Sequence, residues 1–379
     1  MNKELIIRSN SSAVDFALLK DGKLIELNRE VDNNKFSVGD IYAAKIRKPI
    51  SGLNAAFVSV GHEKDGFLHY HDLGPNLSTL FKYFKQVSSG RIKDYSLKNF
   101  RFEKEIPKDG SIQDYLQPRQ QILVQIVKEP ISTKGPRVSS ELSLAGRFMV
   151  LIPFSDRISI SQKIESNTEK NRLKKLVKSI RPKGFGVIIR TVAKDQKVKE
   201  LDSDLQQLLG RWKNLCEKFV KVDQYPNKIL SEINRSSSIL RDIFDNDFTG
   251  IHVDDPEMRQ EIMDYLKTIA PDKVSIVKYF KNKSIPIFDH FGIERQIKTA
   301  FGTTVSMHKG AYLVIEHTEA LHVIDVNSGN RSNKAKSQEQ TALEVNLIAA
   351  SEIARQLRLR DMGGIIVIDF IDLNSNENR

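Results

Sequence analysis

Two short runs of branched apolar residues near the C-terminus, LHVIDVN and IIVID, each carry an aspartate at or near their end. The segment between them, SQEQTALEVNLIAASEIARQLRLRDMGG, has the composition of a helix and stops at Gly363-Gly364. A strand, a long helix and a second strand form a crossover, which returns the second strand parallel to the first. The sequence therefore predicts a parallel strand pair within an α/β sheet.

The connecting helix has a predicted start and a predicted buried face. We expect it to begin at Ser337, because serine caps helix N-termini well. Apolar residues then recur at helical spacing, at positions Leu343, Leu347, Ala350, Ala354 and Leu357. This stripe is expected to pack on the sheet.

Asp325 and Asp369 then lie toward the C-terminal ends of the two strands, where open α/β sheets place their ligand sites. Neighbouring strands are about 4.8 Å apart. At that distance two carboxylates repel each other unless a proton or a cation lies between them. Mg²⁺ prefers such oxygens, and metal-bound water attacks phosphates. Asn327 shares the face of Asp325 and could orient water or a phosphate oxygen. We predict metal-assisted phosphodiester hydrolysis; the alternative is a turn cap and a solvated strand end.

The charge of the chain favours a polyanionic partner. Its net charge of +11 and pI of ≈ 9.4 are typical of nucleic-acid binders, although a basic protein without such a partner is the alternative. No apolar run reaches the ~18 residues of a membrane helix, and the N-terminus lacks a signal-peptide pattern. The single cysteine, Cys216, excludes an internal disulfide framework. We expect a cytoplasmic protein of two or three domains with no membrane partner.

Strand patterns dominate the first part of the chain. Alternating runs flank Asp21-Gly22 and predict a hairpin that is too small to close a core by itself. Short strands at 36–72 and 120–130 predict a small barrel. The stretch between them, 73–119, is basic and aromatic without a clear period. We expect it to be a long loop insertion, in part disordered until a partner binds.

Strands and helices alternate farther along the chain. FMVLIPF and FGVIIRT predict strands, and the second ends on Arg190 and Thr191. TEKNRLKKLVKSI predicts an amphipathic helix that ends before Arg181-Pro182, and LDSDLQQLLGRWKNLCEKFVKV predicts a longer one.

Three stretches together resemble the ribonuclease E / ribonuclease G family of bacterial endoribonucleases: LNAAFVSVGHEKDGFL, TEALHVIDVNSG and NLIAASEIARQLRLRDMGGIIVIDFID. The resemblance spans the whole chain and is closer to the shorter ribonuclease G type. It implies a multidomain α/β fold in which an RNase H-like domain is split by insertions. The implied domains are the split RNase H-like domain at 1–35 and 236–300, an OB-fold RNA-binding barrel at 36–140, a sensor domain for the RNA 5′ end at 141–235, and an incomplete DNase I-like catalytic domain at 301–379.

The resemblance also implies residue roles. Asp325 and Asp369 match the family's magnesium-binding catalytic aspartates, and Asn327 matches its catalytic-site asparagine. Arg190 and Thr191 match the pocket for a 5′-monophosphate, a role that suits them because a guanidinium and a hydroxyl both donate to phosphate oxygens. Without the family, an exposed strand-end pair is the simpler interpretation of these two residues.

In the barrel, Phe57 and Phe67 match the aromatic residues that hold single-stranded RNA, and Lys134 matches a basic residue beside that path. Bases of any identity stack on an aromatic face, which gives these residues a physical reason for the role. The alternative is that both phenylalanines belong to the barrel core and that Lys134 is an ordinary loop lysine.

The implied activity is Mg²⁺-dependent endonucleolytic cleavage of single-stranded RNA, stimulated by a 5′-monophosphate, in the maturation of ribosomal RNA precursors and the decay of mRNA. Members of the family continue past the second aspartate into a two-cysteine zinc-binding segment and a dimerising domain. This chain ends at Arg379 without a CxxC pattern, so we expect no structural zinc in it and a homodimer only for a full-length protein. A non-catalytic RNA-binding protein or an inactive fragment is the main alternative, and a DNA nuclease is a weaker one.

Overall fold

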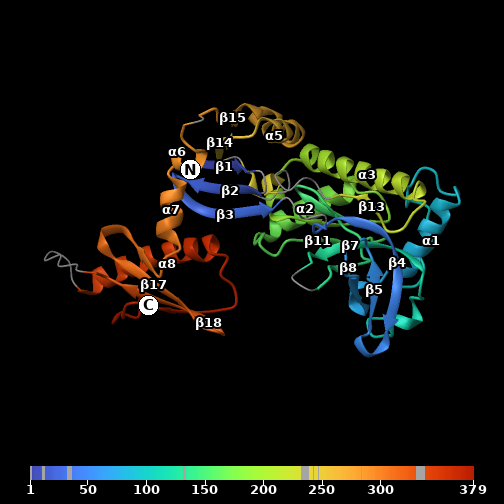
Figure 1. Cartoon of the computed structure of the whole chain (residues 1–379), viewed down its shortest axis with the longest axis horizontal. Coiled ribbons are helices and arrows are strands. Elements are labelled where there is room, and N and C mark those ends of the chain that lie inside the picture. The colour runs from blue at the N-terminus through green and yellow to red at the C-terminus, as the bar shows by residue number, and fades with distance from the viewer. Residues whose placement is uncertain are drawn as a thin grey trace. The chain divides into compact units, whose positions relative to one another are not determined.

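The computed structural model of the chain describes residues 2–10, 13–31, 36–130, 134–231, 239–241, 243–245, 247–282, 284–329 and 338–379. The chain divides into two compact units, Met1–Asn33 with Asn246–Arg379 and Asn34–Asp245. Figure 1 shows the helices and strands of both. Within the described ranges, no helix combines the length and the apolar character needed to cross a bilayer.

The first unit contains a five-stranded sheet in the order β15-β14-β1-β2-β3. Its strands are β1 (Lys3–Ser9), β2 (Ala13–Lys20), β3 (Lys23–Val31), β14 (Phe248–Val253) and β15 (Val277–Tyr279). Asp21 and Gly22 close the predicted β2–β3 hairpin with φ values of 48° and 76°, because a two-residue turn that matches the strand twist needs positive φ at both positions. β14 is parallel to β1, so the N-terminal strands share a sheet with residues far along the chain (Figure 1).

Three helices accompany this sheet: α5 (Pro256–Ile269), α6 (Ile287–His290) and α7 (Ile293–Ala300). Buried Ile6 and Leu24 of the strands pack in one cluster with Ile287, Phe288 and Ile293. The prediction that the first hairpin packs against a later part of the chain is therefore confirmed.

The same unit contains a second sheet in the order β16-β17-β18-β19. Its elements are β16 (Thr304–Ser306), β17 (Tyr312–His317), β18 (Leu321–Asn327), the helix α8 (Gln338–Leu359) and β19 (Ile365–Asp369). β18 is antiparallel to β17 and parallel to β19, with α8 as the connecting helix. The predicted crossover is confirmed, while the predicted cap Ser337 lies outside the described residues.

The buried face of α8 differs from the predicted stripe. Of that stripe, Leu347 is 63% exposed and Ala350 and Ala354 are exposed as well. Instead, the helix buries a neighbouring stripe that contains two polar residues, made of Ala342, Val345, Asn346, Ala349, Ile353, Gln356 and Leu359. Because α8 carries apolar residues on more than one side, the period alone did not determine which side meets the sheet.

The second unit contains a closed five-stranded barrel of the OB-like kind, which confirms the predicted barrel. Its strands are β4 (Ile41–Ile50), β5 (Ala55–Ser59), β6 (Gly66–His69), β7 (Gln121–Lys128) and β8 (Arg137–Ser139). They pair in the order β4-β5-β6-β8-β7, and β7 returns to β4 to close the ring. β6 and β8 form the parallel pair, and β13 (Asn227–Leu230) adds to β4 from outside the ring.

The segment 73–119 is an insertion between β6 and β7, as expected, but it is packed, which corrects the expectation that it is in part disordered. It contains the helix α1 (Leu77–Ser88), and Tyr83, Phe84, Leu97 and Ile112 are at most 5% exposed. The ring of Tyr83 lies 5.7 Å from that of Trp212, far along the chain. The segment lacks an obvious period over most of its length because its aromatic residues find their partners in other elements.

A four-stranded sheet in the order β11-β12-β10-β9 completes the second unit. Its elements are β9 (Leu144–Ala145), β10 (Met149–Pro153), β11 (Ile158–Ile160), α2 (Asn167–Ile180), β12 (Phe185–Ile189) and α3 (Val198–Val220). The two predicted helices are thus confirmed, and α2 ends before Arg181-Pro182 because a proline disfavours the helical conformation of the residue before it. Leu173 of α2 and Leu205 of α3 are buried in the same core as the barrel.

Candidate functional site

Asp325 and Asp369 are direct partners in the register of β18 and β19. Side chains alternate between the two faces of a strand, so Ile324 and Val326 point into the core while Asp325 points out. Ile368 contributes to that core in the same way from β19. Both aspartates are exposed, on neighbouring strands about 4.8 Å apart. The predicted adjacency of the two residues is confirmed; their catalytic role stays a prediction.

Asn327 lies on the same face, two residues beyond Asp325. Its Nδ2 donates a 2.8 Å hydrogen bond to Asp325 Oδ2, which leaves the amide oxygen of Asn327 as an acceptor. On the other side, β17 places Val314 opposite Asp325 and Tyr312 opposite Asn327. The structure therefore brings all three predicted residues to one exposed edge of this sheet.

The donor atoms of this group suit a hard cation. Two carboxylates and one amide oxygen are oxygen ligands, and Mg²⁺ is commonly held by one or two carboxylates while it keeps several waters. Within the described part of the chain, no cluster of three or more His, Cys, Asp or Glu side chains is gathered as a metal site. Asp325 and Asp369 would therefore supply the charged ligands, and the remaining positions would fall to water and substrate.

Asn346 is a residue of this region that the sequence interpretation missed. It is 8% exposed on α8, and its side chain forms two hydrogen bonds with the backbone of Ile371. Asn346 Nδ2 donates to the Ile371 carbonyl at 2.8 Å, and the Ile371 N–H donates to Asn346 Oδ1 at 3.0 Å. This pairing fixes the chain two residues after Asp369. The available signal was a polar residue between apolar ones in the predicted helix. It was missed because Asn346 lies outside the stripe that we expected to be buried.

Phe57 and Phe67 are partners across β5 and β6, with ring centroids 6.1 Å apart. Both are half-buried, whereas their strand neighbours Ala56 and Leu68 are fully buried. The alternative that both phenylalanines are core residues is therefore wrong. Their rings face outward on the second and third strands of the barrel, the surface on which OB-folds bind oligonucleotides.

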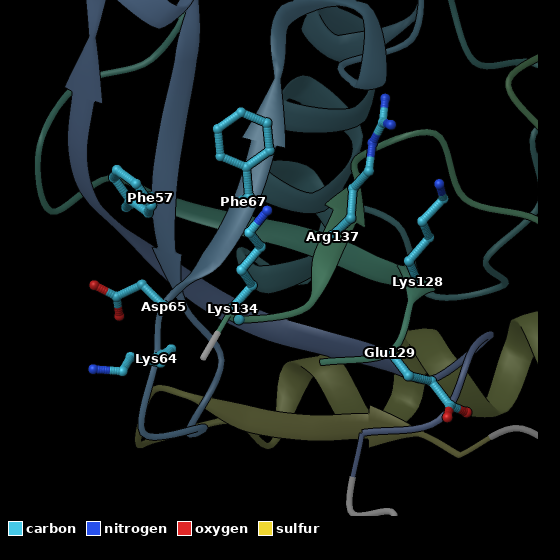
Figure 2. A pocket seen from close by; sticks show the side chains of 9 residues that line it. Phe57, Lys64, Asp65, Phe67, Lys128, Glu129, Lys134 and Arg137 are labelled. Carbon is cyan, nitrogen blue, oxygen red and sulfur yellow. The ribbon is translucent and has the colours of Figure 1, made fainter. Parts of the chain in front are cut away.

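A hollow of ≈ 760 Å³ lies beside these rings, and exposed Lys134 lines it together with them (Figure 2). Basic side chains around it outnumber acidic ones, with Lys64, Lys128, Lys134 and Arg137 against Asp65 and Glu129. Figure 2 shows Glu129 pointing away from the phenylalanine rings. The lining therefore offers ring faces and positive charge, the two features that single-stranded nucleic acids need.

Arg190 and Thr191 follow β12 in the same unit, on another sheet. Arg190 is half-buried, and its Nη1 donates to the Gly146 carbonyl at 2.8 Å. Thr191 is exposed, and its hydroxyl lies 2.9 Å from that of Ser161. The guanidinium is thus held in place by backbone, while Thr191 presents a hydroxyl at the surface.

Asp204 organises the backbone that holds Arg190, and the sequence interpretation missed it too. Its buried carboxylate on α3 accepts from the N–H groups of Arg147, Phe148 and Met149 at 2.9, 2.9 and 3.1 Å. Burial raises the pKa of Asp204 above its ordinary value, and these three donors oppose that shift. A Cβ on Gly146 would lie 2.7 Å from the carboxylate oxygens, so the close approach requires glycine there.

Comparison with known proteins decides the family. The family described as "Ribonuclease E/G family" matches residues 143–379. The chain is also 31% identical over 379 residues to ribonuclease G of Escherichia coli K12, covering 100% of this chain and 73% of that protein. The chain belongs to the ribonuclease E/G family.

Members named ribonuclease E are similar to the chain as well. The protein of Synechocystis is 34% identical over 354 residues, covering 92% of this chain and 48% of its own length. The Nostoc protein is 33% identical over 383 residues, covering 100% and 51%. The family that the sequence motifs suggested is thereby confirmed. The family match contains Asp325, Asp369 and Arg190, whereas Phe57 and Phe67 lie in the region that only the longer alignments cover.

Proposed function

We propose that this protein is an endoribonuclease that hydrolyses single-stranded RNA with the help of Mg²⁺. The observation that carries the proposal is the direct register pairing of two exposed aspartates, Asp325 and Asp369, at the end of a parallel strand pair. Exposed like charges on adjacent strands oppose folding, so their juxtaposition calls for a positively charged ligand. A divalent cation bound by the two carboxylates satisfies this requirement and can also bind a phosphate of the substrate. The net charge of +11 favours RNA as the source of that phosphate.

In this proposal, Asp325 and Asp369 hold the cation with their carboxylate oxygens. When bound, Mg²⁺ makes a water molecule a better nucleophile and offsets the charge that grows on the phosphate. Asn327 is kept in position by its hydrogen bond to Asp325. Its amide oxygen accepts a hydrogen bond from a water molecule beside the phosphate and so orients that water. Cleavage leaves a 5′-phosphate on the downstream product.

In the same proposal, the barrel binds the RNA substrate. Bases stack on Phe57 and Phe67 independently of their identity, at about 1–3 kcal/mol for each base. Lys134, together with Lys64 and Lys128 of the hollow, neutralises the RNA backbone, which makes binding weaker as the salt concentration rises.

The 5′ end of the RNA is proposed to bind at Arg190 and Thr191. The fixed guanidinium of Arg190 and the exposed hydroxyl of Thr191 both suit a terminal phosphate. RNA with a 5′-monophosphate should therefore be cut faster than the same RNA with a triphosphate. Roles in ribosomal RNA maturation and mRNA decay, the split domain layout, a cytoplasmic location and a homodimeric full-length protein remain predictions.

The test is cleavage of a 5′-monophosphorylated single-stranded RNA with Mg²⁺ or with EDTA, by the wild type and by Asp325→Asn. We expect metal-dependent cutting that Asp325→Asn abolishes while RNA binding is kept. Cutting at the wild-type rate by the variant would remove Asp325 from the active site. Tight RNA binding with no cutting by the wild type would instead support a non-catalytic RNA-binding protein.

A further inference from the structure

The aromatic surface of the barrel does not end at Phe57 and Phe67. On β6, His69 lies two residues after Phe67, so both side chains point to the same outer face. Their ring centroids are 6.5 Å apart, with an angle of 29° between the ring planes. His71 continues the series, with its ring 5.0 Å from that of His69. Four rings therefore follow one another across β5, β6 and the 3₁₀ helix Tyr70–Asp72.

These rings are accessible to a ligand. Phe57, Phe67 and His69 are half-buried, and His71 is exposed. The residues between them, Leu68 and Tyr70, are 0% and 2% exposed and form the core beneath. The alternation of strand residues thus separates a buried apolar layer from an outer row of rings.

The position of His69 is fixed by a backbone hydrogen bond. The N–H of His71 donates to His69 Nδ1 at 3.2 Å, so the neutral ring carries its proton on Nε2. That bond caps the short helix that follows, which is the purely structural explanation for a histidine here. The cap uses only one nitrogen atom, and it leaves a ring face and an Nε2–H donor for a ligand.

The support under His71 is rigid as well. Arg137 binds Asp72 with two hydrogen bonds of 2.9 and 3.0 Å, which raises the pKa of Arg137. Ser139 donates to the Asp72 carbonyl at 2.7 Å, and the Ser140 N–H donates to the same carbonyl at 2.9 Å. The 3₁₀ helix is therefore tied to the β8 side of the barrel. A preorganised platform loses little entropy when a strand of RNA binds.

We propose that the RNA-binding path extends from Phe57 and Phe67 across His69 to His71, so that single-stranded RNA is bound by four successive rings. This extension rests on the proposed function and adds binding length to the same surface. Stacking needs only a flat ring, which makes the extended path independent of base identity. The Nε2–H of His69 adds a donor for a phosphate or ribose oxygen.

The test is the affinity of 5′-hydroxyl oligonucleotides of about two nucleotides, which are too short to reach all four rings, and of about ten nucleotides, measured by fluorescence anisotropy in EDTA, so that cutting and 5′-end recognition do not contribute. We expect His69→Ala and His71→Ala each to weaken binding of the longer RNA about fivefold, and to leave the shorter RNA within about twofold of the wild type. His69→Phe is the matched variant, because it also lacks the Nδ1 cap but keeps the ring. It should bind the longer RNA within about twofold of the wild type.

Two results would overturn the extension. One is wild-type affinity for the longer RNA in both histidine→Ala variants. The other is equal weakening by His69→Ala and His69→Phe, which would make the ring nitrogens, as cap or as donor, responsible rather than stacking on the ring. Phe67→Ala separates this failure from that of the proposed function. If Phe67→Ala weakens binding and the histidine variants do not, only the extension fails. If Phe67→Ala also binds normally, the whole path on this surface is wrong.

Discussion

Replacing Asp369 with asparagine should remove activity and yet stabilise the metal-free protein. Asp325 and Asp369 are paired in register on neighbouring strands, and both are exposed to solvent. Two unit charges about 5 Å apart in water repel by roughly 0.8 kcal/mol, and salt at physiological strength reduces this by about half. Favourable cross-strand pairs, including opposite charges, contribute about 0.2–1 kcal/mol, and like charges directly opposite each other are destabilising, so the repulsion is of the same order as other cross-strand terms. Asp369→Asn should therefore gain about 0.5 kcal/mol when no cation is present.

Mg²⁺ should reverse the order of stability. A ligand that binds only the folded state stabilises it by RT ln(1 + [L]/Kd), which is about 1.4 kcal/mol at ten times Kd. The wild type gains this amount, whereas Asp369→Asn has lost a charged ligand and gains less. For a unit of this size, each kcal/mol shifts the melting temperature by about 2–4 °C. The variant should melt about 1–2 °C above the wild type in EDTA and below it in saturating Mg²⁺.

The assay is thermal unfolding of both proteins at low ionic strength, with EDTA and over a series of Mg²⁺ concentrations, beside cleavage of a single-stranded RNA. Asp272→Asn is the control, because it removes an exposed charge in the same unit outside the candidate site. It should show neither the gain in EDTA nor a weaker response to Mg²⁺. The reasoning is refuted if Asp369→Asn is no more stable than the wild type in EDTA and Mg²⁺ raises both melting temperatures equally.

Three further predictions concern residues outside the aspartate pair. Asn346→Asp keeps an acceptor for the Ile371 N–H but cannot donate to the Ile371 carbonyl, so the rate of RNA cleavage should fall about tenfold or more. An unchanged rate would show that this contact does not position the site. Asp204→Asn should lower the free energy of urea unfolding by about 1–3 kcal/mol, because buried N–H groups lose a charged acceptor; equal stability would contradict this. The hydrogen bonds from Arg172 lower the pKa of Glu169 from 4.5 to about 2, so the pair stabilises the fold above pH 4.5 and this contribution is lost as the pH falls toward 2. The stability advantage of the wild type over Glu169→Gln, measured by urea unfolding, should shrink over that range, and a constant difference would refute it.

Short-range pattern was sufficient to predict the elements that carry the candidate site. The apolar runs around Asp325 and Asp369 and the helix between them predicted a crossover, and a crossover leaves little choice about strand direction. The predicted adjacency followed from connectivity alone. The Asp21-Gly22 hairpin was equally local, because two residues with positive φ are enough to define its turn.

Predictions about faces were less successful. Leu347 belonged to a plausible apolar stripe on α8 and is 63% exposed, while the polar residue Asn346 is buried. The reason is that Asn346 finds its two hydrogen-bond partners on Ile371, which is 25 residues away. Burial of a polar group depends on whether such a partner is present, and a periodic pattern contains no information about that.

The chain by itself therefore determined the Asp21-Gly22 hairpin, the helices α2 and α3 and the crossover that pairs two aspartates, because these follow from local backbone preferences and connectivity. Only the tertiary structure decided that the segment 73–119 packs through Tyr83 against Trp212 and that the rings of Phe57 and Phe67 face outward. It likewise decided that Asp204 binds a turn more than 50 residues earlier in the sequence. Each of these depends on surfaces from distant parts of the chain fitting together, and packing and hydrogen bonding at such contacts are properties of the assembled fold.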